Sequence, residues 1–223
     1  MNATDLGTGT AADAARAART ESRRQQLFRA AARLMEDRGS HDVSMQAVAD
    51  EAGVSVGLIY RYFGNKQDLV QAVIVSVLEA FTREVEEAME DQADPVRRIA
   101  AAFAGYCSVV QEQREAAVLA YRESKTLEAA GRKTIMDLEV QTAAPLMTAV
   151  ADAVDAGLIR PVDIRLFAYQ LLMTAHGWAL KHWYFGDFIS HEGYVAEHTA
   201  LALSAVLLPG NRSDYADLLG ALA

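Results

Sequence analysis

Two short helical segments separated by a glycine turn occupy residues 44–63, and they constrain the fold more than any other part of the sequence. Ser44 precedes the first segment and Ser55 precedes the second, so we expect each serine to cap the helix that follows it. Gly53 and Val54 are expected to form the tight turn between the helices. Because the second helix of such a pair can enter the major groove of DNA, the segment predicts a helix-turn-helix motif.

The second short helix has two chemically different faces. At about 100° per residue, Val56, Ile59 and Phe63 fall on one side, which we expect to pack inward. Gly57 and Arg61 fall near the opposite side. A glycine there lets the backbone approach base edges, and an arginine can donate two hydrogen bonds to a guanine or hold a phosphate. The outward pair therefore indicates DNA recognition.

Neighbouring residues are expected to extend this surface. Tyrosine hydroxyls reach phosphates, and residues at helix N-termini place donors where phosphate binds well. The predicted DNA-binding residues are Ser44, Gln46, Ser55, Val56, Gly57, Leu58, Tyr60, Arg61, Tyr62 and Lys66.

The rest of the chain is also patterned for helix. Four prolines and fourteen glycines interrupt 223 residues, and no stretch shows sustained alternation of apolar and polar residues. Further helices are expected at 21–39, from residue 66 onward, and at 95–113, 116–128, 131–156, 163–185 and 191–208. The predicted fold class is therefore all-α, with a three-helix DNA-binding domain at the N-terminus and a larger helical domain after it.

Charge is distributed unevenly along the chain. The net charge is −9, yet residues 1–66 carry nine Lys and Arg against eight Asp and Glu. Such asymmetry is a hint of a nucleic-acid-binding end, although a solvated helix face has a similar composition. The arm that bears Arg16 and Arg19 is open to both interpretations: solvated charges, or a contact with a neighbouring groove of the DNA.

Residues 21–81 resemble the DNA-binding domain of the tetracycline-repressor (TetR) family. The resemblance rests on Ser44, Ala49, Gly53-Val54-Ser55, Gly57, Leu58-Ile59-Tyr60, Tyr62-Phe63, Asn65-Lys66 and Leu69. It implies an all-helical homodimer whose last two long helices form a four-helix interface and whose central helices enclose a ligand pocket. It also implies a ligand-responsive repressor that binds a near-palindromic operator and is released by a small-molecule effector, whose identity the resemblance does not give. The methionines among the expected pocket residues favour an apolar or amphipathic effector. An activator, or a regulator controlled by a protein partner, is the alternative.

The predicted organisation has four parts. Residues 1–20 are expected to be a disordered arm, 21–65 the DNA-binding domain, 66–210 the ligand-binding and dimerisation domain, and 211–223 a C-terminal tail.

Two sets of residues are expected to serve the effector and the dimer. The predicted pocket residues are Phe103, Tyr106, Cys107, Val110, Leu119, Tyr121, Arg122, Met136, Met147, Met173 and His176. The predicted dimer residues are Trp178, Trp183, Val195, Ala196, Ala200, Leu203 and Leu207. Aromatic and methionine side chains at helical spacing are also typical of a plain core. Arg122 and Lys125 either form a solvated face, which we favour, or meet an anionic head group such as that of an acyl-CoA.

Other functional classes are disfavoured. Gly53–Gly57 matches the pattern of a serine-hydrolase elbow at Ser55, but that chemistry needs a strand before the turn. No two histidines have the spacing of four that lets them share a metal ion, so neither a metal nor another cofactor is expected. With one cysteine and no long apolar run, we expect a cytoplasmic protein that is neither an enzyme nor membrane-bound.

Overall fold

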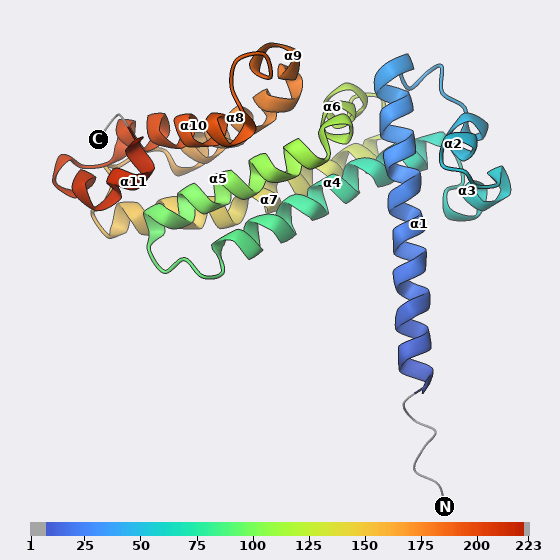
Figure 1. The fold of residues 1–223 in the computed structure, drawn as a ribbon, viewed down its shortest axis with the longest axis horizontal. Helices are drawn as coiled ribbons and strands as arrows, with labels where there is room; N and C mark the ends of the chain where they lie inside the picture. The colour runs from blue at the N-terminus through green and yellow to red at the C-terminus, as the bar shows by residue number, and fades with distance from the viewer. Residues whose placement is uncertain (1–7, 221–223) are drawn as a thin grey trace, which may run out of the picture. The chain divides into compact units, whose positions relative to one another are not determined.

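The computed structural model describes residues 8–220, which are almost entirely helical (Figure 1). The helices are α1 (Thr8–Arg38), α2 (Met45–Glu51), α3 (Val56–Tyr62), α4 (Lys66–Met89), α5 (Pro95–Glu112), α6 (Arg114–Glu123), α7 (Ala129–Asp155), α8 (Ile164–Leu180), α9 (His182–Phe185), α10 (His191–Val206) and α11 (Ala216–Leu219), with a 3-10 helix at Pro209–Tyr215 before α11. Over this range no strand forms, although an isolated antiparallel bridge joins Ile159 and Leu207. The all-α prediction is confirmed. None of the described helices combines the length and apolar character that a membrane span requires.

The chain divides into two compact units, Met1–Val73 and Ile74–Ala223, and the division falls inside α4. Each unit has a core of its own. The N-terminal unit contains α1, α2, α3 and the start of α4, and the C-terminal unit contains the remaining helices.

The core of the N-terminal unit holds α3 in place. Ile59 is fully buried, and the ring of Phe63 packs on the ring of Phe28 from α1 at a centroid distance of 5.9 Å. At the end of α2, the amide of Gln26 donates a hydrogen bond of 2.9 Å to the carbonyl oxygen of Ala52. Gly53 has a φ of 63°, a conformation that a side chain would strain, and so permits the turn into α3.

The first helix begins earlier in the chain than predicted. Residues 8–20, expected to be disordered, form the first turns of α1, while residues 1–7 lie outside the described structure. The physical reason is composition, because alanine and arginine are among the best helix formers. Extending a helix that is already anchored by packing at Leu27 also avoids the cost of nucleating a new one.

Helices α5, α7 and α8 run side by side and form the centre of the C-terminal unit (Figure 1). Gly105 on α5 allows a close approach to α4, because a Cβ atom there would lie 3.1 Å from the carbonyl oxygen of Glu84. The helix expected at 163–185 is interrupted at Lys181, which has φ −126° and ψ 26°. The break accompanies the packing of Phe185 against Trp178, whose rings stack at 6.5 Å.

The C-terminal tail predicted at 211–223 is also wrong for the described residues up to 220. Tyr215 and Leu219 are buried, and the Tyr215 hydroxyl donates a hydrogen bond of 2.7 Å to Asp94, the residue that caps α5. Arg97 forms two hydrogen bonds to Asp217, at 2.8 and 3.1 Å. Tyr215 and Leu219 are four residues apart and both are buried, so this short segment packs as part of the C-terminal unit.

Candidate nucleic-acid interface and effector cavity

Helix α3 buries one face and exposes the other. Ile59 and Phe63 are buried, whereas Gly57 and Arg61 are exposed and Tyr60 keeps 54% of its surface accessible. The partly buried residues Val56, Leu58 and Tyr62 flank the exposed face. The exposed face of α3 therefore combines a glycine, the guanidinium group of Arg61 and the phenol of Tyr60.

The two serines expected to cap helices behave differently. The Ser44 hydroxyl accepts a hydrogen bond of 3.1 Å from the backbone N–H of Ala47 and caps α2. Ser55 has the backbone conformation of a cap, but its hydroxyl makes no capping hydrogen bond in the described structure. Ser55 follows a helix, not a strand, so the strained turn that a hydrolase elbow requires is absent from residues 44–63.

The sequence predicts that Lys66 binds DNA phosphate, but its ammonium group is occupied within the protein. Its Nζ donates hydrogen bonds to the carbonyl oxygens of Ser40 (2.7 Å), His41 (3.1 Å) and Val43 (3.1 Å). An ammonium has three N–H donors, and these three carbonyls use all of them. Lys66 thus ties the loop after α1 to the start of α4. On α2, the exposed amide of Gln46 bonds to Asp50 at 2.7 Å.

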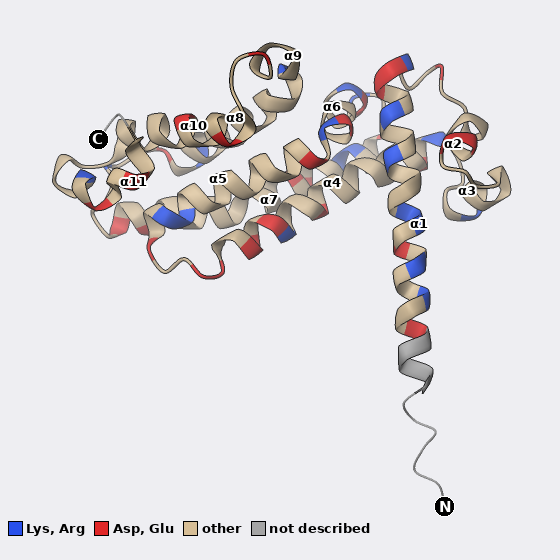
Figure 2. Cartoon of the chain, in the orientation of Figure 1, with Lys and Arg blue, Asp and Glu red and all other residues tan. Residues whose placement is uncertain are grey.

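The charge on α1 contrasts with the acidic balance of the whole chain. Figure 2 shows blue positions along this helix, where seven arginines outnumber four Asp and Glu. Arg33 forms an ion pair with Glu51 at the end of α2. Helix α3 therefore belongs to the same unit as α1, whose charged residues are mostly basic.

A cavity of about 240 Å³ lies within the C-terminal unit, between α4, α5, α6, α7 and α8. It is lined by Ile74, Val77, Leu78, Phe81, Tyr106, Ala117, Ala120, Tyr121, Ser124, Glu139, Thr142, Tyr169, Leu172, Met173 and His176. Four of the predicted pocket residues are among them, namely Tyr106, Tyr121, Met173 and His176.

The other predicted pocket residues lie elsewhere. Phe103, Cys107, Val110 and Leu119 are buried in the packing between helices, Met147 is half-buried, and Met136 and Arg122 are exposed. The prediction also missed the four residues that α4 contributes, from Ile74 to Phe81. Their spacing indicates an apolar helix face, but spacing alone does not separate a cavity wall from a filled core.

Tyr121 and His176 form a polar side-chain pair in the mostly apolar cavity. The Tyr121 hydroxyl and Nδ1 of His176 share a hydrogen bond of 2.7 Å, and their rings meet edge to face at 5.3 Å. Burial lowers the pKa of His176 from 6.5 to about 4 and raises the pKa of Tyr121 to about 12. Both groups are therefore neutral at pH 7, and they offer hydrogen bonds without charge. Burial also raises the pKa of Glu139, which lines the same cavity.

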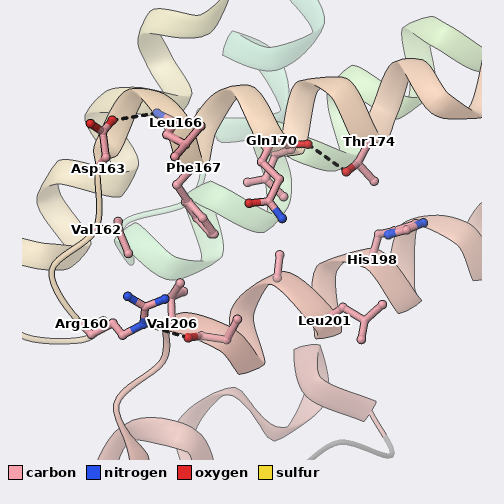
Figure 3. Close-up of a pocket in the computed structure, with 13 residues that line it drawn as sticks. Arg160, Val162, Asp163, Leu166, Phe167, Gln170, Thr174, His198, Leu201 and Val206 are labelled. Atoms are coloured by element: carbon pink, nitrogen blue, oxygen red, sulfur yellow. Dashed lines mark hydrogen bonds between the residues drawn. The ribbon is translucent and has the colours of Figure 1, made fainter.

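A second concavity is a groove of about 500 Å³ between α8 and α10, called here the α8–α10 groove. It is lined by Arg160, Val162, Asp163, Leu166, Phe167, Gln170, Leu171, Thr174, His198, Leu201, Ala202, Ala205 and Val206. Figure 3 shows Leu166 and Gln170 from α8 across from His198 and Leu201 of α10. Leu166 is 70% exposed and Leu201 is 54% exposed, so apolar surface lies open on this face.

None of the seven predicted dimer residues lines the α8–α10 groove. Trp178, Ala200, Leu203 and Leu207 are buried inside the subunit, which leaves them no surface for a partner. Val195 and Ala196 line a different groove beside α5, and Trp183 is exposed on α9. Ala200, Leu203 and Leu207 are misplaced because α10 is apolar on more than one side, and the side that carries them packs against α5 and α11. Trp183, Val195 and Ala196 keep accessible surface and stay predicted dimer residues.

Two family models match the chain. The model described as bacterial regulatory proteins of the tetR family matches residues 27–73, and the one described as a tetracyclin repressor-like C-terminal domain matches residues 92–203. Together they cover the helix-turn-helix motif and four of the five helices that form the cavity, while residues 74–91, which include most of α4, lie between the two matches.

Individual relatives agree with these models. The HTH-type transcriptional regulator HbdR of Aromatoleum sp. (strain CIB) is 39% identical over 196 residues, covering 88% of this chain and 86% of that protein. The structure of AibR in complex with isovaleryl coenzyme A and operator DNA aligns with a TM-score of 0.70 at 26% identity, over 80% of this chain and 97% of that one. The regulator FadR from Bacillus subtilis in complex with stearoyl-CoA gives a TM-score of 0.65 at 20% identity, over 80% and 95% of the two chains.

The half-buried His176 predicts a specific pH dependence of stability. Because the pKa of His176 is near 4 in the folded protein and 6.5 in the reference state, the unfolded chain takes up a proton first as the pH falls. The free energy of unfolding should decrease by up to about 3 kcal/mol from this residue between pH 6.5 and 4, and change no further below 4. Urea denaturation of the wild type and His176→Gln at several pH values measures the difference, and parallel pH profiles for the two proteins would contradict the prediction.

Proposed function

The chain belongs to the TetR family of bacterial transcription regulators, and from this premise we propose that it is a homodimeric repressor that reads its operator with α3. Two copies of α3, held about 34 Å apart, enter successive major grooves of a near-palindromic site. The observation that carries the proposal is the exposed face of Gly57, Tyr60 and Arg61 opposite the buried Ile59.

Gly57 supports the assignment of α3 as the DNA-reading helix, because packing within the protein does not require a glycine at this position. A Cβ atom at this position would meet nothing within 4 Å, and glycine inside a helix costs about 0.5–1 kcal/mol relative to alanine. A close approach by another molecule explains the missing side chain. In the proposed complex, Arg61 one turn later donates to a base edge or a phosphate, and the Tyr60 hydroxyl contacts a phosphate.

Substitution of Gly57 separates DNA recognition from folding. Gly57→Leu should leave the thermal midpoint unchanged or raise it, because the site is open and leucine favours helix. Affinity for a duplex selected by the wild type from a random library should fall at least about tenfold, as measured by fluorescence anisotropy. Gly210→Leu, at an equally open glycine in the C-terminal unit, is the matched control and should bind as the wild type does. A stable Gly57→Leu protein with wild-type affinity would refute the role of α3.

For the dimer, we propose that the α8–α10 groove packs against the same groove of a second copy. Its exposed leucines form the kind of apolar surface that single chains rarely leave open to water. An interface of this type is self-complementary, since each partner presents the same patch across a two-fold axis.

A charge placed in the groove should break the dimer. Leu201→Glu is expected to give a folded monomer by light scattering and to lower operator affinity, because two linked recognition helices are needed to span the site. Val140→Glu, at a 59% exposed apolar position on α7, is the control that should remain dimeric. A dimeric Leu201→Glu variant would place the interface elsewhere.

For the effector, we propose a coenzyme A thioester whose acyl group enters the cavity. The support is the AibR complex with isovaleryl coenzyme A, together with a cavity of about 240 Å³ whose walls are mostly apolar. The cavity is too small for a whole coenzyme A molecule. Arg122 and Lys125, next to the lining residues Tyr121 and Ser124, are exposed where the anionic part of the ligand would emerge.

Helix α4 is the proposed route from effector to DNA. Its residues Ile74, Val77, Leu78 and Phe81 line the cavity, and its first turn belongs to the N-terminal unit through the bonds of Lys66. An effector that shifts α4 changes the geometry of both recognition helices, and by linkage DNA weakens effector binding by the same factor.

The effector proposal is tested by release from DNA. A panel of short-chain, branched and aromatic acyl-CoA thioesters, with free coenzyme A and the free acids, is added to the protein–duplex complex. At least one thioester should lower DNA affinity, and the free acid should do so much less. Ala120→Phe should abolish the response while leaving DNA affinity intact, because the added ring fills the cavity without replacing a packed side chain. Full induction in Ala120→Phe, or no response to any thioester, would reject the proposal.

A further inference from the structure

The N-terminal part of α1 has no role in the core. Side chains 13–23 are all exposed, and the first buried residue of the helix is Leu27. At 1.5 Å per residue, these eleven residues extend the helix by about 16 Å beyond the packed region. A helix that is exposed on every side gains nothing from the interior of its own domain, so a function for it requires contact with another molecule.

Three arginines form a stripe on this extension. Arg16, Arg19 and Arg23 are spaced three and four residues apart, which places them within an arc of about 60°. Among the described residues, none of the three has a carboxylate partner, while nearby Glu21 interacts with Arg24 and Gln25. The stripe is therefore a row of exposed positive charges.

The side of α1 that carries the stripe is the side that faces the helix-turn-helix motif. Arg19, Gln26 and Arg33 follow one another at intervals of seven residues, about 20° apart around the helix. Gln26 bonds to Ala52 and Arg33 pairs with Glu51, so both contact the end of α2 just before the turn into α3. The arginine stripe continues this same face by about three turns toward the N-terminus.

We propose that Arg16, Arg19 and Arg23 bind the phosphate backbone of DNA that flanks the base pairs contacted by α3. This inference rests on the proposed operator binding and adds a second contact to it. The stripe spans about 10 Å, and phosphates of one strand recur every 3.4 Å along the axis, so it covers about three phosphates. Residues 13–23 include no apolar side chain larger than alanine, so they lack what insertion into a membrane surface requires.

The test compares two duplexes and two proteins. One duplex contains only the selected operator, and the other adds about ten flanking base pairs on each side. The wild type should bind the longer duplex more tightly, and a variant with Arg16, Arg19 and Arg23 changed to Ala should lose that preference. Its log–log dependence of affinity on salt should be shallower by up to about five for a dimer, at about 0.9 per phosphate contact. Circular dichroism should show an unchanged helix content, because alanine favours helix more than arginine does.

A matched control removes three exposed cations from the C-terminal unit by changing Arg83, Arg132 and Lys133 to Ala. This control should keep the preference for the longer duplex. The inference fails if the arginine variant retains that preference and the wild-type salt slope. Binding to an acidic polypeptide, polyglutamate, is measured as well. The inference also fails if the variant binds both duplexes as the wild type does and is impaired only in binding polyglutamate. Gly57→Leu separates this failure from that of the proposed function, since it lowers the affinity for both duplexes at least about tenfold only if α3 reads the operator.

Discussion

Burial of Ile59 and Phe63 orients the surface on which the proposed function depends. Once these two side chains pack into the N-terminal unit, helical geometry turns Gly57 and Arg61 to the outside. The Phe63 ring packs on Phe28, so α1 takes part in setting the rotation of α3. The same few apolar contacts therefore determine both the stability of a small three-helix unit and the face that it offers to DNA.

The C-terminal unit uses its core in another way. Helices α4 to α8 surround a cavity in which the side-chain pair of Tyr121 and His176 is kept neutral by burial. An effector that enters replaces empty space with contacts and need not displace a buried charge. Because α4 belongs to both units, it is the helix through which the proposed effector signal would reach the DNA-binding end.

Much of the N-terminal unit could be predicted from the sequence, and less of the C-terminal unit could. The spacing of Ile59 and Phe63 and the turn at Gly53 define the motif locally, within twenty residues. In the C-terminal unit, apolar residues cover more than one side of a helix, and periodicity does not say which side packs inward. For this reason the sequence pattern predicts Ala200 and Leu203 at the dimer interface, whereas they pack within the subunit. Tertiary partners such as those of Lys66 also leave no local signal, since its three carbonyls come from a loop more than twenty residues earlier.

The most direct test of the account is a structure of the protein bound to its selected duplex. We expect α3 to lie in the major groove, with Gly57 in van der Waals contact with a base edge or the sugar–phosphate backbone and with the Arg61 guanidinium hydrogen-bonded to DNA. A complex in which Gly57 and Arg61 point to solvent, while another part of the chain fills the groove, would contradict it.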